Sequence, residues 1–100
     1  MAKKVSLAQK ESVIIEDALT ESDDGAKAIK NNSSYDVNDA VQTLYGDVAE
    51  IKKIDDETSG HDSKKRNTIN KVQKLIAKAD KKPAVKVFKK IKKDIRRLVK

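Results

Sequence analysis

Apolar residues recur at steps of three and four over most of this chain, and the pattern is clearest between Pro83 and Lys100. One face of that stretch carries only apolar side chains: Ala84, Val87, Phe88, Ile91, Ile95 and Leu98. Residues at this spacing share one face of an α-helix. The other face is lysine and arginine, with Asp94 as its single acidic residue. The pattern predicts an amphipathic helix that needs an apolar partner and leaves a cationic face to be explained.

Three earlier segments show the same helical spacing, and sustained apolar–polar alternation typical of strands is missing. The longest unbroken stripe consists of Val37, Ala40, Val41, Leu44, Val48, Ile51 and Ile54. The sequence predicts helices at about 6–20, 36–57, 63–79 and 83–99. Four amphipathic helices of this kind are expected to bury their stripes against one another. We therefore predict a single all-α domain over residues 1–100, a small antiparallel four-helix bundle. A three-helix core with a looser first helix is the alternative.

Residues that interrupt helices predict where the segments end. Residues 22–35 are rich in Ser, Asn and Asp and contain a glycine, which predicts a polar loop. We expect Ser34 or Asp36 to cap the second helix and Pro83 to be the first residue of the fourth. Gly46 falls inside the second helix, where glycine costs about 1 kcal/mol relative to alanine. It is expected to permit the close packing of a neighbour.

Charge is distributed unevenly along the chain. The net charge is +7, but residues 1–63 contain 7 Lys/Arg and 14 Asp/Glu, a net of −7. Residues 64–100 contain 16 Lys/Arg and 2 Asp/Glu, a net of +14. Two interpretations remain open together. The acidic half can fold against the basic half and neutralise part of it, and the excess positive charge can contact nucleic acid, anionic lipid or an acidic protein.

No residue pattern identifies a reaction. The chain has no cysteine, and His61 is its only histidine, so no zinc site or cofactor is expected. The three glycines are isolated and cannot form a phosphate-binding loop. The carboxylates of residues 55–57 predict a solvated acidic patch that faces Lys64, Lys65 and Arg66. We therefore expect a protein that is not an enzyme and takes no small-molecule substrate.

The expected contact surface is the basic face of the third and fourth helices. Its residues are Lys64, Lys65, Arg66, Lys71, Lys74, Lys78, Lys86, Lys89, Lys90, Lys93, Arg96 and Arg97. A protein partner or another acidic surface is the first expectation. Nucleic acid is the alternative, although lysine reads sequence poorly and Tyr35, Tyr45 and Phe88 are the only aromatic residues for base stacking. No apolar run is long enough for a membrane span, so a cytoplasmic protein is expected, with peripheral attraction to membranes left open.

The segment INKVQKLIAKADKKPAVKVFKKIKKDI, from Ile69 to Ile95, resembles the C-terminal half of the immunity proteins of pediocin-like (class IIa) bacteriocins. The similar features are an apolar-spaced helix with small residues near its end (Ala77 and Ala79), a short basic link, Pro83, and the stripe that follows. The resemblance covers roughly a quarter of the chain. It implies a cytosolic antiparallel four-helix bundle whose C-terminal half recognises a bacteriocin docked on a sugar-transporter receptor.

Overall fold

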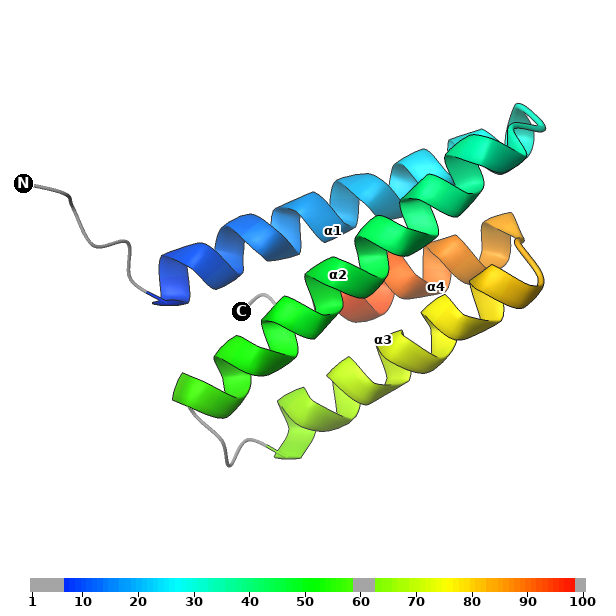
Figure 1. Cartoon of the computed structure of the whole chain (residues 1–100). Coiled ribbons are helices and arrows are strands. Elements are labelled where there is room, and N and C mark those ends of the chain that lie inside the picture. Colours follow the sequence, from blue (N-terminus) through cyan, green and yellow to red (C-terminus); the bar gives the residue numbers. More distant parts are fainter. Residues whose placement is uncertain (1–6, 59–62, 99–100) are drawn as a thin grey trace, which may run out of the picture.

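The computed structural model describes residues 7–58 and 63–98, and these residues form four α-helices (Figure 1). The helices are α1 (Leu7–Lys30), α2 (Ser34–Thr58), α3 (Ser63–Lys81) and α4 (Val85–Arg96). Successive helices run in opposite directions, so the predicted antiparallel four-helix bundle is confirmed. The radius of gyration is 13.9 Å, close to the roughly 13 Å typical of a folded chain of this length.

The helices form a closed ring in which each packs on two others. In the described part of the chain, α1 contacts α2 and α4, and α3 contacts α2 and α4, whereas the backbones on the diagonals do not approach each other. The first helix is a full member of this ring, because its Ile15, Ala18 and Ala28 are buried in the common core. The alternative of a three-helix core with a loose first helix is therefore wrong.

The apolar stripe of α4 is part of the core and not a contact surface. Phe88, Ile91 and Ile95 have no exposed surface at all, and Val87 and Leu98 are nearly as buried. They meet the predicted stripe of α2 and the buried Ile69, Val72, Ile76 and Ala79 of α3. The outward side of α4 is therefore left to its lysines, its arginine and Asp94.

The predicted polar loop over residues 22–35 is wrong, because α1 continues to Lys30. Ser22 is buried, and its hydroxyl donates a hydrogen bond of 2.8 Å to the carbonyl oxygen of Ala18, within the helix. Ala18, Ser22, Gly25 and Ala28 repeat at steps of three and four, so they form a buried face of small residues. Composition favoured a loop here, but tertiary packing decides in favour of helix.

Phe88 of α4 packs against this face at Gly25. A Cβ atom at Gly25 would lie 2.7 Å from Cδ1 and 2.8 Å from Cζ of the Phe88 ring, which is closer than carbon atoms can approach. Gly25, and not Gly46, is therefore the glycine that permits close helix packing. The expectation for Gly46 is wrong, since a Cβ there would meet nothing within 4 Å and the residue is exposed on α2.

The end of α1 is marked by one residue in the left-handed conformation. Asn32 has φ = 56°, and its N–H donates to the carbonyl oxygen of Ile29 while that of Ser33 donates to Ala28. These two bonds complete the Schellman motif, which satisfies the last carbonyl groups of a helix. Asparagine tolerates this conformation better than most residues, so a turn of only three residues joins α1 to α2.

Two expected helix starts are displaced. The residue that precedes the first turn of α2 is Ser33, whereas Ser34 or Asp36 was the predicted cap. The carbonyl oxygen of Ser33 accepts a hydrogen bond from Val37 N–H, and its hydroxyl donates one to Asp36 Oδ2 at 2.8 Å. Ala84 precedes α4, because its backbone is extended and its carbonyl accepts the first helical hydrogen bonds. Pro83 therefore lies in the connection and not in the helix. The helix over 63–79 extends to Lys81 and the one over 83–99 covers Val85–Arg96.

Candidate functional site

A cationic groove runs between α3 and α4 on the outside of the bundle. We call it the α3/α4 groove; it encloses about 500 Å³. Its lining consists of Lys71, Lys74, Leu75 and Lys78 from α3 and Lys90, Lys93, Asp94 and Arg97 from α4 and the turn after it. Six of these eight side chains are cationic. Because cations of two helices meet there, we take it as the candidate site.

Helical spacing explains why these side chains meet. Lys71, Lys74 and Lys78 follow one another at i, i+3 and i+7, and so lie in one row along α3. Lys90, Lys93 and Arg97 repeat the same spacing on α4. The short connection after α3 makes the two helices antiparallel neighbours (Figure 1), and the buried stripes orient both rows outward along the same seam.

The charges of the groove are hardly neutralised from within the protein. Asp94 is its one carboxylate, and its Oδ1 lies 3.8 Å from the guanidinium of Arg97. The five lysines of the groove make no ion pair with any residue that the structure describes. Like charges held this close repel one another in proportion to how poorly water screens them. The groove therefore carries positive charge that the described residues leave largely uncompensated.

The twelve residues predicted for the contact surface divide into three groups. Lys71, Lys74, Lys78, Lys90, Lys93 and Arg97 line the groove. Lys64, Lys86, Lys89 and Arg96 are exposed elsewhere. Lys65 and Arg66 are engaged within the bundle, as described next. The predicted contact surface did not include Leu75 or Asp94; only the pairing of the two helices shows that both line the groove.

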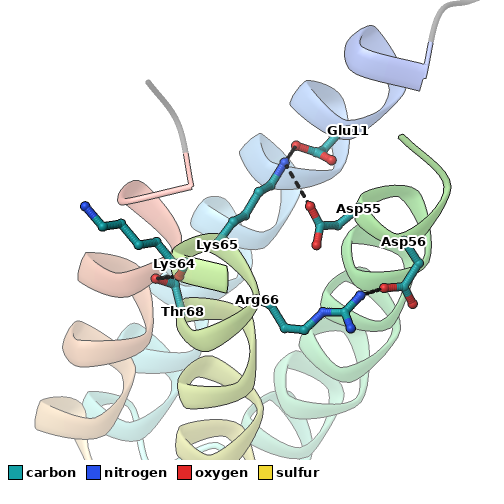
Figure 2. Close-up of polar contacts among 7 residues, drawn as sticks. All are labelled: Glu11, Asp55, Asp56, Lys64, Lys65, Arg66 and Thr68. Atoms are coloured by element: carbon teal, nitrogen blue, oxygen red, sulfur yellow. Dashed lines mark hydrogen bonds and ion pairs between the residues drawn. The ribbon is translucent and has the colours of Figure 1, made fainter. Parts of the chain in front are cut away.

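Lys65, in the first turn of α3, is held by carboxylates from two other helices (Figure 2). Its Nζ lies 2.6 Å from Glu11 Oε1 of α1 and 3.9 Å from Asp55 Oδ1 of α2. Asp55 is almost fully buried, so the expectation of a solvated patch over residues 55–57 is wrong for this residue. Arg66 forms an ion pair with Asp56. Both cations are thereby paired within the protein, Lys65 mostly buried and Arg66 with 42% of its side chain exposed, whereas Lys64 points away from the cluster.

The opposite side of the bundle is acidic. Helices α1 and α2 together carry 13 acidic and 5 basic residues, whereas α3 and α4 carry 2 acidic and 13 basic residues. Ion pairs cross between the two halves at Lys65, at Arg66 and at Lys92, whose Nζ lies 2.8 Å from Asp23 Oδ1. The interpretation that the two halves neutralise each other partly is therefore confirmed, and the groove keeps an excess of positive charge. Contact of this excess with nucleic acid, anionic lipid or an acidic protein stays a prediction.

Carboxylates crowd together between α1 and α2. Burial raises the pKa of Asp47 from 3.8 to about 7, with further contributions from a hydrogen bond with the Asp17 side chain and from the charges of Asp17 and Glu21. The pKa of Glu21 is also raised, first by burial and then by the charges of Asp24, Asp17 and Asp39. In the described part of the chain, no group of three or more His, Cys, Asp or Glu is placed to hold a metal ion. His61 lies outside the described residues.

This crowding predicts that stability depends on the Asp47 proton. Since the pKa of Asp47 is higher in the folded state, the folded chain binds a proton that the unfolded chain releases between about pH 4 and 7. The free energy of unfolding should therefore fall as the pH rises through that window. Asp47→Asn should remove this slope, because asparagine carries no charge that burial and the neighbouring carboxylates could destabilise. At pH 8 the variant should be about 1 to 2 kcal/mol more stable, a gain limited by water, which screens part of the charge of this half-buried group.

Urea unfolding of the two proteins at pH 4 and pH 8 measures the effect. Glu50→Gln is the matched control, since Glu50 is an exposed carboxylate on the same helix. An equal gain from both substitutions, or no change of the Asp47→Asn gain with pH, would contradict the prediction.

A second cavity, of about 400 Å³, lies at the end of the bundle where the α1–α2 and α3–α4 connections meet. Its lining is apolar or uncharged apart from Asp80: Ala28, Ile29, Asn32, Ser33, Ser34, Val37, Asn38, Val41, Ala79 and Pro83. None of the twelve predicted contact residues reaches it. It offers no grouped charge or nucleophile, so the groove remains the candidate site.

Comparison with known proteins adds no relative. No protein-family model matches the chain, and no curated protein or solved structure matches it either. None of the described helices is both long enough and apolar enough to cross a membrane.

Proposed function

We propose that this chain is a non-enzymatic binding protein that contacts an acidic partner through the α3/α4 groove. One observation supports the proposal above all others: six cations surround one groove, and its five lysines have no internal ion-pair partner in the described structure. Elsewhere the bundle does pair basic groups that approach carboxylates, as at Lys65 and Lys92. Charge left uncompensated at a concave surface steers and holds an oppositely charged ligand.

Within this class we propose an immunity protein of the bacteriocin-directed type, acting in the cytoplasm on a toxin–receptor complex. The four-helix bundle is the fold that the resemblance implies. The resembling segment, Ile69 to Ile95, also contains every groove-lining residue except Arg97. The half of the chain that carries the resemblance is thus the half that carries the candidate site.

Nucleic acid is the second candidate, because lysine rows neutralise phosphates without any further requirement. The asparagine, glutamine and aromatic side chains of α3 and α4, which could hydrogen-bond or stack with bases, are not positioned in the groove. Arg66 is engaged by Asp56, and Phe88 is fully buried. Asn67, Asn70 and Gln73 do not line the groove. Binding of this kind would be non-specific and would weaken steeply with salt.

Expression of the chain in bacteria that are sensitive to pediocin-like bacteriocins tests the proposal. We expect protection against at least one bacteriocin of a panel, and loss of that protection in the double variant Lys74→Glu/Lys90→Glu. Because the groove lysines repel one another, this reversal should not lower stability. The matched control, Lys89→Glu/Arg96→Glu, changes the net charge equally on exposed positions outside the groove and should keep protection.

Absence of protection across the panel would remove the immunity role. Protection that survives reversal of the groove charges would remove the groove as the contact surface.

A further inference from the structure

The two cationic rows of the α3/α4 groove have the dimensions of a short helical segment. Each row covers seven residue steps, from Lys71 to Lys78 and from Lys90 to Arg97. At 1.5 Å per residue each row is about 10.5 Å long, which is two helical turns. The rows flank the seam between two antiparallel helices, and a further helix laid along such a seam presents side chains to both flanks at once.

The groove has one apolar side chain in its lining, Leu75 of α3, and one carboxylate, Asp94 of α4, which pairs with Arg97. Leu75 lies between the rows, is half-buried and packs against the core cluster. The lysine side chains add their aliphatic stems to the walls, since only their terminal ammonium groups need water. A ligand that fills this groove therefore needs an apolar strip toward Leu75 and anionic groups along both edges.

Other polyanions meet these requirements less well. None of the three aromatic residues lines the groove: Phe88 is buried, Tyr45 packs at the core edge, and the exposed Tyr35 lies at the start of α2. A single strand of nucleic acid would find no stacking surface. An anionic membrane would need an exposed apolar face to insert, but the stripe of α4 is buried in the core.

We propose that the α3/α4 groove binds an acidic amphipathic helix of the partner protein. Apolar side chains of that helix pack on Leu75. Carboxylates at i, i+3 and i+7 on its two flanks meet the lysines of α3 and the Lys90, Lys93 and Arg97 row of α4. This is the helix-in-groove mode of peptide recognition, with charge complementarity setting the partner chemistry. The inference rests on the proposed function, because it names the kind of partner that the same groove accepts.

Fluorescence anisotropy with labelled peptides of about 16 residues, enough for four turns, tests this directly. One peptide carries leucines on a single helical stripe with glutamates on both sides; a scrambled peptide has the same composition without the stripe. At about 0.15 M salt we expect the amphipathic peptide to bind about tenfold more tightly than the scrambled one. Lys74→Glu/Lys90→Glu should weaken its binding about tenfold, and Lys89→Glu/Arg96→Glu less than twofold.

Leu75→Gln separates shape from charge. It should weaken binding of the amphipathic peptide about threefold or more and leave that of the scrambled peptide unchanged, with circular dichroism verifying the helical fold. Equal affinity for both peptides would overturn the inference in favour of diffuse electrostatic attraction. Tighter binding of a single-stranded or duplex oligonucleotide, or of phosphatidylglycerol vesicles, would overturn it in favour of that ligand.

Failure here is distinguishable from failure of the proposed function. If cells are protected through the groove but neither peptide binds, the partner is not an acidic helix, and the inference falls while the function stands. If the amphipathic peptide binds in the groove and no bacteriocin is countered, the inference stands and the immunity role falls.

Discussion

Replacing Gly25 with valine is expected to lower the free energy of unfolding by about 3 kcal/mol, as overpacking of a closed core does. The ring of Phe88 already occupies the space that a Cβ atom would need. Phe88 is fully buried, so it cannot turn away without displacing its own neighbours. The expected result is the opposite of what helix propensity alone predicts, since valine is the better helix former.

Gly46→Val is the matched control for this experiment. It makes the same substitution in the middle of a helix, but no side chain or other helix lies within 4 Å of the new Cβ position, so stability should change by less than about 0.5 kcal/mol. Combining Gly25→Val with Phe88→Leu should cost at least about 1 kcal/mol less than the sum of the single changes, because the smaller side chain makes room. Urea denaturation of the four variants measures this coupling, and strictly additive effects would contradict the proposed contact.

Lys65→Met is expected to cost about 3 kcal/mol at pH 7. The methionine keeps the length and the packing of the side chain but removes the charge that lies between Glu11 and Asp55 (Figure 2). Asp55 is almost fully buried, and Glu11 is only 13% exposed, so their charges would be left close together with little water. A buried charge that loses its partner destabilises a fold more than the intact pair stabilises it.

Lys64→Met provides the control, because the neighbouring Lys64 is exposed and points away from the cluster. Its loss should change stability by less than about 0.5 kcal/mol. Adding Glu11→Gln and Asp55→Asn to Lys65→Met should recover at least half of the lost stability, since the three uncharged groups no longer repel. Thermal unfolding of the three proteins compares them. Equal costs at residues 64 and 65 would mean that the cluster contributes nothing.

Two groups of basic residues in the C-terminal half can be distinguished, those in ion pairs with α1 and α2 and those in the α3/α4 groove. Lys65 and Arg66 lie where α3 approaches Glu11 of α1 and the acidic end of α2, and Lys92 lies where α4 meets α1. They join the halves of the bundle. The groove residues lie on the one seam that has cations on both sides, which is why the fold cannot pair them internally. Binding is therefore expected to depend on the groove charges, and folding on the cluster at Lys65.

Helical periodicity by itself determined most of the architecture. The stripes of residues 36–57, 63–79 and 83–99 are regular because each buries one face, and their helices begin and end within three residues of the predicted bounds. The sequence also showed that the N-terminal half is acidic and the C-terminal half basic. Six of the twelve predicted contact residues line one groove.

Only the tertiary structure decided the rest. Residues 22–30 are helical because Phe88, more than sixty positions later, packs on Gly25 and requires small residues around it. No local pattern reports such a contact. The burial of Asp55 and the withdrawal of Lys65 likewise depend on which helix ends meet in space. Side-chain spacing reveals which residues share a face, but the packing of one face on another determines which charges remain free to bind.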